Sequence, residues 1–511
     1  MIDLSTHAIQ GDKWLYDVLS AQKTEIFPDE FRLNFLYTSD EFNNRQSVGK
    51  TLMRLQEYLA ILDIPNFFVV VHTNKQDIQQ DLVETHRIFS PTDEVISHKF
   101  IDGTFNKIIK KYKSFCILPW LNLHVNAQGL VAPCCQFDEN YPIANLADTD
   151  IKDVVNNDHL KLVRKQMLND ERPTVCNNCW KQEDIGINSM RNDVNSAYGD
   201  YSHLIAQTSE SGEFDFKLES IDFRASNVCN MRCRMCSGKY SSRIAQEEII
   251  LYPSIQKNEN FVENKLNNTQ ITEVLSFISS QLNNLKLIYF AGGEPLLMEE
   301  HYKILDLFLE NNKLDIDIEY NTNLSILKYK NISVIDYWKK FKKISLNASL
   351  DLIDEKANYV REGADYRDIE KNFLLLPDNV NFFVDSTYTI YNVFDLPHLQ
   401  KRWITKFNLS PRAFKIRLSL LPPEIMSCRI LPDCYKKQAS DLINEHIKWL
   451  LTIKDSEKLV DRWRVVLNFM NSADCSHLLP TFFKLNDDKD RHRKEVFEEV
   501  FPEYKNLRSY V

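Results

Sequence analysis

The 511-residue sequence lacks both a long apolar run and an excess of positive charge. Apolar stretches such as FFVVV at 67–71 are far shorter than the roughly 18–20 residues that a transmembrane helix needs. The formal net charge is −10, so nucleic acid is not an expected partner. The opening residues, MIDLSTHAIQGDKW, have neither a basic start nor an apolar stretch, and a signal peptide is not expected. We therefore expect a cytoplasmic protein with no membrane partner.

Histidine metal motifs are also missing, because His124, His398, His446 and His492 stand in no HxxH or HExxH spacing. No nucleophile and base pair indicates hydrolysis. Cysteine, in contrast, is plentiful: eight of the eleven cysteines fall between residues 116 and 236, in closely spaced groups. In a cytoplasmic chain this pattern favours metal or redox chemistry over disulfides.

The length predicts three or four structural units. Residues 1–104 are predicted to form a small α/β domain of unassigned role, with strands at 31–38 and 67–73 and helices near 47–62 and 76–89. Residues 105–200 form a cysteine-rich domain with a helix near 158–169. A polar stretch at roughly 192–215 is typical of a linker.

From residue 217 to 423 strands alternate with helices, and the last unit, 424–511, is predicted to be a helical extension. Near-continuous apolar strands of this kind predict an α/β fold with a parallel sheet curled into a partial (β/α)6 barrel. The six expected strands span 219–225, 285–292, 314–322, 342–350, 381–390 and 414–421. Helices are expected between them, for example at 299–311, 333–342, 366–376 and 395–407.

Three cysteines follow the first of these strands in the segment NVCNMRCRMCS, namely Cys229, Cys233 and Cys236. Three thiolates at such short spacing can hold one corner of a [4Fe–4S] cube. The fourth iron then keeps an open position for the amine and carboxylate of a small molecule. A zinc site is the alternative, although structural zinc prefers four ligands and this loop offers three.

The C-x3-C-x2-C segment resembles the signature of the radical S-adenosylmethionine (SAM) superfamily, C-x3-C-x-φ-C, in which φ is usually aromatic. Met235 occupies φ in this chain, and a polarisable thioether can still pack beside an adenine. The resemblance implies that Cys229, Cys233 and Cys236 are the catalytic ligands of a SAM-binding [4Fe–4S] cluster.

Four further segments match the superfamily in the expected order. The resemblance implies that Gly292, Gly293 and Glu294, after the second strand, hold the methionine part of SAM. It also implies three further SAM contacts. These are Asn323 at the end of the third strand, Ser349 (with Ser345 as an alternative) on the fourth, and Arg361, whose guanidinium would pair with the SAM carboxylate.

A second cysteine set precedes the barrel: Cys116, Gly129 and Cys134 in the spacing C-x12-G-x4-C, then Cys176 and Cys179 as CxxC. It resembles the twitch domain, the short form of the SPASM domain, and implies an auxiliary [4Fe–4S] cluster with four cysteine ligands. Gly129 is predicted to lie in a hairpin turn that returns Cys134 towards Cys116. A four-cysteine zinc site remains an alternative.

The position of this set before the barrel is typical of radical SAM proteins with an N-terminal twitch domain. The remaining cysteines are interpreted as spare or buried thiols: Cys135, Cys428, Cys434 and Cys475.

The resemblance implies a reaction in which an external reductant of the flavodoxin or ferredoxin type supplies one electron to the cluster. SAM is then cleaved to methionine and a 5′-deoxyadenosyl radical, which removes hydrogen from a C–H bond. We expect an oxidoreductase-type enzyme acting on a peptide, a sugar or another small metabolite. Two alternatives remain open: a radical SAM methyl- or group-transferase, and a zinc-binding interaction protein without catalytic activity.

Overall fold

A computed structural model describes most of the chain beyond residue 111 and three strands before it. The described parts are β1 (Ile2–Asp3), β2 (Phe31–Thr38), β3 (Phe67–Asn74) and residues 112–184, 188–198, 202–253, 262–418 and 424–511. The chain divides into two compact units. The first comprises residues 1–117, 166–172 and 188–208, and the second comprises the rest.

Near the N-terminus, β1, β2 and β3 form a parallel sheet in that order. The strands predicted at 31–38 and 67–73 are confirmed. The helices predicted near 47–62 and 76–89 lie outside the described residues.

The polar stretch predicted as a linker at 192–215 is helical over much of its length, so this prediction is wrong. It contains most of α9 (Met190–Tyr198) and all of α10 (Ser202–Gln207). The Asn195 side chain accepts a hydrogen bond from Ile117 N at 3.0 Å and donates one to Phe115 O at 2.9 Å. A polar composition indicated a linker because the sequence does not reveal which backbone groups its side chains will bind.

In the second unit, nine strands of the described chain form one sheet. Their order is β16 (Phe414–Leu418), β15 (Val380–Tyr388), β13 (Lys343–Ser349), β10 (Asp317–Thr322), β9 (Leu287–Phe290), β7 (Ser220–Phe223), β4 (Asn122–Val125), β5 (Leu130–Ala132) and β6 (Ala144–Asn145). The six strands from β7 to β16 are parallel and coincide with the six predicted strands, whose last three residues, 419–421, lie outside the description. The predicted α/β fold with a parallel sheet is confirmed.

The sheet continues beyond the predicted barrel strands. Strand β4 pairs in parallel with β7, with His124 opposite Asp222, and β5 and β6 extend the sheet antiparallel to β4. The cysteine-rich segment therefore adds strands directly to the edge of the parallel sheet.

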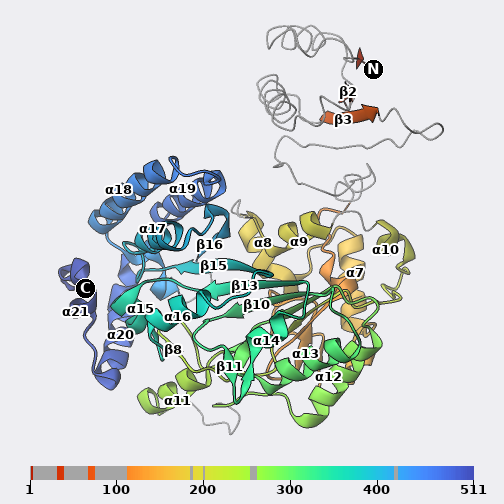
Figure 1. Ribbon diagram of the computed structural model, residues 1–511, viewed down its shortest axis with the longest axis horizontal. Coiled ribbons are helices and arrows are strands. Elements are labelled where there is room, and N and C mark those ends of the chain that lie inside the picture. The colour runs from red at the N-terminus through yellow and green to blue at the C-terminus, as the bar shows by residue number, and fades with distance from the viewer. Residues whose placement is uncertain are drawn as a thin grey trace. The chain divides into compact units, whose positions relative to one another are not determined.

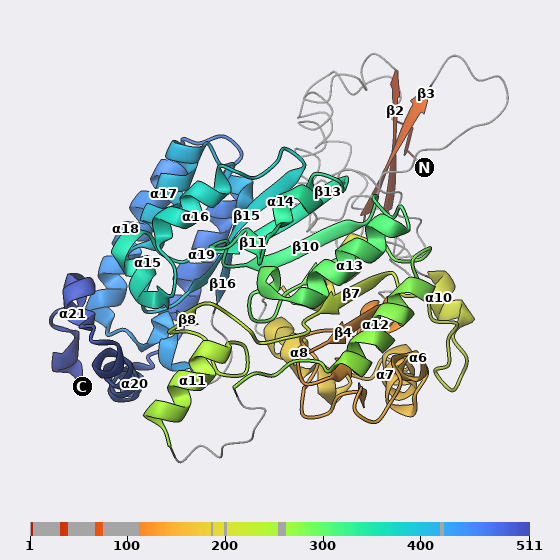
Figure 2. The same ribbon diagram turned by 60° about the horizontal axis from the view of Figure 1, so that its bottom comes forward.

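Helices between the strands cover one face of the sheet, and Figure 2 shows α12 (Asn268–Ser280) and α13 (Glu299–Glu310) lying along it. Aromatic side chains fill this layer: Phe290 packs on His301 of α13, Tyr320 on Trp338 of α14 (Val334–Trp338), and Phe382 on Trp403 of α17 (Leu396–Phe407). Because successive residues of a strand point to opposite faces, the residues between these aromatics face the other side of the sheet. The remaining connecting helices are α11 (Ser242–Leu251), α15 (Asp354–Val360) and α16 (Tyr366–Phe373).

The C-terminal extension is helical, as predicted, and Figure 1 shows it at one end of the sheet, in blue. It consists of α18 (Asp433–Leu450), α19 (Glu457–Asn471), α20 (Leu479–Arg493) and the short α21 (Phe497–Val500). Within the described part of the chain, no helix combines the length and apolarity needed to span a bilayer.

Replacing Leu346 in the central strand β13 by alanine tests the core. Its side chain is fully buried, so L346A leaves a cavity and is expected to lower the free energy of unfolding by about 2–5 kcal/mol. Denaturant unfolding followed by circular dichroism measures this. Leu374, which is 69% exposed, is the control, and an equal loss in L374A would contradict the assigned core.

Candidate active site

The loop that carries Cys229, Cys233 and Cys236 follows β7 and is held by a short antiparallel ladder. Cys233 belongs to β8 (Arg232–Cys233), which pairs with β14 (Arg361–Glu362) so that Arg361 lies opposite Cys233. Arg234 N donates to Val360 O at 2.7 Å, and Cys236 N donates to Cys233 O at 3.0 Å. These hydrogen bonds therefore fix the backbone conformation of the loop.

Neighbouring groups contact two of the three thiols of this loop. Met231 N donates to Cys229 Sγ at 3.5 Å, and Arg361 Nη1 donates to Cys233 Sγ at 3.8 Å. Burial raises the pKa of Cys229 and of Cys236 to about 12, and the charges of Cys233 and Cys229 add to the effect on Cys236. Half-buried thiols that would repel one another as thiolates fit a site in which iron supplies the compensating positive charge.

Two glycines let the segment after β9 lie directly against this loop. A Cβ on Gly293 would stand 2.1 Å from Val228 O, and one on Gly292, at a φ of +116°, would stand 2.8 Å from Ser226 O. The backbones are joined by Gly293 N to Ser226 O at 3.1 Å and Glu294 N to Val228 O at 2.8 Å. The two glycines therefore make room for the cysteine loop itself, and their role towards SAM stays a prediction.

Glu294 is 1% exposed, and both of its carboxylate oxygens accept hydrogen bonds. Oε1 accepts from Thr322 Oγ1 at 2.6 Å and from Leu296 N at 3.2 Å, and Oε2 accepts from Asn323 N at 2.8 Å. Burial raises the pKa of Glu294 to about 7, against the lowering effect of these hydrogen bonds. An ammonium ion that approached this buried carboxyl would favour its ionised form and lower its pKa.

Asn323 joins the end of β10 to the cysteine loop. Its side chain donates to Asn230 Oδ1 at 2.9 Å, and its own Oδ1 accepts from Ser325 N at 2.9 Å. Ser349 lies at the end of β13, opposite Asp385 of β15, and Ser345 lies four residues earlier on the same strand. Their roles towards SAM stay predictions.

Arg361 lies against the cysteine loop. Its Nε is 2.6 Å from Asp351 Oδ2, while Nη1 contacts Cys233 Sγ. Asp351, which is 1% exposed, was not identified from the sequence, although it ends the segment SLNASLD that marked Ser349. Met235 accepts a contact from Thr389 Oγ1 at 3.5 Å through its sulfur.

Three cysteines of the second set, Cys134, Cys176 and Cys179, belong to the same compact unit as a β-hairpin. The predicted turn is confirmed: β4 and β5 are antiparallel and Gly129 has a φ of +78°. Cys134 follows β5, and Asp138 N donates to Val175 O at 2.8 Å, which brings its loop beside Cys176, the residue just before α8 (Asn177–Asp184). Cys179 lies within α8 and is buried.

Cys116 belongs to the first compact unit, and the other three cysteines of this set belong to the second. Its place as fourth ligand stays a prediction. Across the described residues, no three histidine, cysteine, aspartate or glutamate side chains gather closely enough to hold one metal ion.

The sheet face opposite the aromatic layer is charged. Arg224 makes two 2.8 Å contacts to Asp222, Arg417 binds Asp385 at 2.7 Å, and Lys415 donates to Asn347 Oδ1 at 2.7 Å. Cys135 lies beside the first of these pairs, and its pKa is raised to about 11 by burial and then by the Asp222 carboxylate.

The outlying cysteines are not all buried, which corrects one expectation. Cys428 is fully buried, but Cys434 is exposed and its Sγ lies 3.1 Å from Tyr510 Oη. Cys475 is half-buried.

Comparison with known proteins identifies the domains. Residues 224–395 match the Radical SAM superfamily, and residues 116–180 match the SPASM iron–sulfur cluster-binding domain. The chain therefore carries one segment similar to radical SAM domains, which use a [4Fe–4S] cluster and SAM, and one similar to SPASM domains, which bind auxiliary iron–sulfur clusters.

Among curated proteins, the chain is similar to 7-carboxy-7-deazaguanine synthase of Clostridium acetobutylicum, with 23% identity over 184 residues. The match covers 36% of this chain and 65% of that protein. Among solved structures, anSMEcpe with bound AdoMet matches 46% of this chain and 61% of its own at 17% identity and a TM-score of 0.32. Streptococcus suis SuiB bound to S-adenosylmethionine matches 64% of this chain and 67% of its own at 13% identity and a TM-score of 0.29.

Gly293→Ala is expected to displace the backbone at Val228, because a Cβ at that position would overlap a carbonyl oxygen at 2.1 Å. The variant should retain less iron after anaerobic reconstitution, measured per chain. Ala291→Gly, which changes backbone freedom in the same loop without a clash, serves as control. Equal iron in G293A and the unaltered protein would contradict the prediction.

The raised pKa of Glu294 predicts a pH dependence of stability in the metal-free protein. The folded state binds this proton more tightly than the unfolded chain, whose ordinary value is 4.5. The contribution is therefore complete below pH 4.5 and is lost as the pH rises through about 7.

The variant Glu294→Gln lacks this pH-dependent contribution. The free energy of unfolding of E294Q, relative to that of the unaltered protein, is therefore expected to rise by roughly 3 kcal/mol between pH 4.5 and pH 8. Urea unfolding at several pH values measures the difference. A difference that stays constant with pH would contradict the assignment.

Proposed function

We propose that this protein is an oxidative radical SAM enzyme that modifies a C–H bond of a polar substrate, a peptide, a sugar or another small metabolite, with help from an auxiliary [4Fe–4S] cluster. In this proposal Cys229, Cys233 and Cys236 hold the SAM-binding cluster. Cys116, Cys134, Cys176 and Cys179 hold the auxiliary cluster.

The observation that carries the proposal is the contact between the two cysteine loops. Glu139, five residues after Cys134, forms an ion pair with Lys239 and accepts a hydrogen bond from Tyr240 Oη at 3.2 Å, and these two residues follow Cys236 closely. The pKa of Tyr240 is raised first by burial and is also sensitive to the charges of Cys135 and Cys236. Two cysteine loops this close suit electron exchange between a reactive and a supporting cluster.

When bound, the cluster and SAM supply a 5′-deoxyadenosyl radical that abstracts hydrogen from an unactivated C–H bond. The residues around Glu294 would receive the ammonium group of SAM, since its carboxyl is buried and faces donors only. Arg361 would hold a carboxylate beside Cys233, where its guanidinium already lies.

The charged face of the sheet supports a polar substrate. Asp222, Arg224, Asp385, Lys415 and Arg417 come from three different strands or their ends and offer hydrogen-bonding groups of both signs. Polar groups that are paired with each other in the absence of ligand can exchange partners when a polar molecule binds. An external one-electron reductant is a further part of the proposal.

Anaerobic reconstitution followed by iron and sulfide analysis tests the two sites. The unaltered protein is expected to hold about eight irons, as two [4Fe–4S] clusters. The triple variant C229A/C233A/C236A should hold about four and should release no 5′-deoxyadenosine after dithionite reduction in the presence of SAM. Cys434→Ala, which changes an exposed thiol outside both sets, is the matched control and should behave as the unaltered protein.

Zinc in place of iron, or an unchanged iron count in the triple variant, would overturn the ligand assignment. Full reconstitution without 5′-deoxyadenosine release would overturn the proposed activity.

A further inference from the structure

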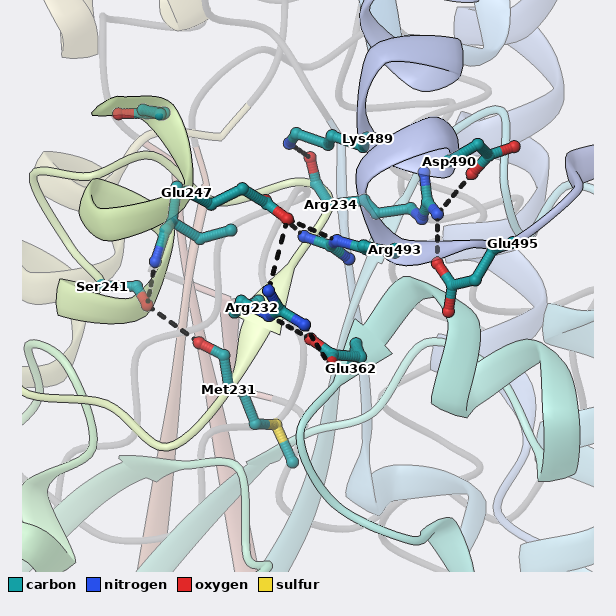
Figure 3. A network of polar contacts seen from close by, with 12 residues as sticks. Met231, Arg232, Arg234, Ser241, Glu247, Glu362, Lys489, Asp490, Arg493 and Glu495 are labelled. Carbon is teal, nitrogen blue, oxygen red and sulfur yellow. Dashed lines mark hydrogen bonds and ion pairs between the residues drawn. The ribbon is translucent and has the colours of Figure 1, made fainter. Parts of the chain in front are cut away.

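Arg234 lies within the interval between Cys233 and Cys236 and is entirely buried. Figure 3 shows its guanidinium pointing away from Met231 towards Asp490 and Glu495, at the C-terminal end of α20 and just beyond it. Nη2 lies 2.5 Å from Asp490 Oδ1 and 2.5 Å from Glu495 Oε2. Nη1 donates to Asn486 Oδ1 at 3.0 Å. We name Asn486, Asp490 and Glu495 the α20 anchor.

The rest of Arg234 is held as well. Its Nε donates to Tyr359 O at 3.1 Å, and its guanidinium stacks 3.6 Å from the centre of the Tyr359 ring. Its backbone carbonyl accepts a hydrogen bond from Lys489 Nζ at 3.1 Å. The α20 anchor is braced in turn, since Tyr359 Oη donates to Asp490 at 2.7 Å. Both the backbone and the side chain of Arg234 therefore depend on α20.

A second connection reaches the residue on the other side of Cys233. Arg493 of α20 binds Glu247 of α11 through two contacts of 2.7 and 2.6 Å, and both side chains are 1% exposed. Glu247 lies 3.7 Å from Arg232, which also binds Glu362. Figure 3 shows these residues as one network. Cys233 is thus flanked by two arginines, and both are connected to the same C-terminal helix.

We propose that Arg234 is a positioning residue for the SAM-binding cluster and that α20, through its anchor, fixes the geometry of the Cys233–Cys236 interval. The inference rests on the proposed function, in which Cys229, Cys233 and Cys236 are the ligands. A guanidinium whose donors are all directed to fixed acceptors allows little movement of its backbone. The backbone at Cys233 and Cys236, on either side of Arg234, is therefore also restricted in its movement. The C-terminal extension then positions the ligands of the cluster in addition to packing against the barrel.

If these ion pairs served only to hold the extension to the barrel, then breaking any one of them would affect the cluster to the same extent. The chain offers a matched comparison in Lys356 of α15, whose Nζ lies 2.8 Å from Asp395 and 2.7 Å from Glu503 of the same extension. This ion pair joins the extension to the barrel without contacting the cysteine loop. A positioning role requires that Arg234 and Lys356 differ in their effect on the cluster.

The test compares R234M, R234K and K356M in the full-length chain after anaerobic reconstitution. Iron loss to a chelator is followed with time, and the electron paramagnetic resonance spectrum of the reduced protein is recorded with and without SAM. R234M is expected to lose iron about tenfold faster from the SAM-binding site, the scale of effect of outer partners on metal retention. Its SAM-induced spectral change should be diminished, R234K should recover part of it, and K356M should stay within about twofold of the unaltered protein.

If R234M does not fold, as judged by circular dichroism, the triple variant R234M/D490N/E495Q replaces it. This variant removes the cation together with both carboxylates and leaves no unpaired buried charge. Unchanged iron loss and an unchanged spectrum in the folded variant would overturn the inference, and so would equal effects of R234M and K356M.

The triple variant C229A/C233A/C236A separates this inference from the proposed function. If it keeps a SAM-induced spectral change, the ligand assignment fails. If it loses that change while R234M retains it, only the positioning role fails.

Discussion

The candidate active site depends on the close approach of two backbone segments. The segment after β9 and the cysteine loop approach so tightly that Gly293 has no room for a side chain. This contact places the cysteine loop at the carboxyl end of the parallel sheet and orients Glu294 towards Thr322, the last residue of β10, and Asn323, which follows it. The loop also contacts β14, the N-terminal end of α11 and α20.

Most of the fold was predictable from local patterns. The six parallel strands, the hairpin at Gly129 and the C-terminal helices follow from apolar periodicity and turn residues within short windows. The addition of β4 to β7 was not predictable, because nothing in either strand specifies which edge will pair with which. The linker prediction failed for a related reason: Asn195 forms its hydrogen bonds with Phe115 and Ile117, eighty residues or so away in sequence.

The candidate site, too, was predictable from the sequence only in part. Cysteine spacing indicated the two candidate sets of ligands, and the structure places Cys233 opposite Arg361 on a short ladder, with Cys229 and Cys236 a few residues to either side. Arg234 was overlooked because an arginine between two cysteines gives no local sign of burial. Its partners in the α20 anchor lie between 252 and 261 residues further along the chain. Asp222 and Arg224 were overlooked because they resemble ordinary strand-end charges until the sheet register places them on the face opposite the helices.

The order in which the chain is synthesised gives the distant partners of Arg234 a further meaning. Asn486, Asp490 and Glu495 do not yet exist when the ribosome has completed the barrel, so the Cys233–Cys236 interval cannot be locked before residue 495 has emerged. Until then the nascent loop lacks the contacts that hold Arg234 to α20.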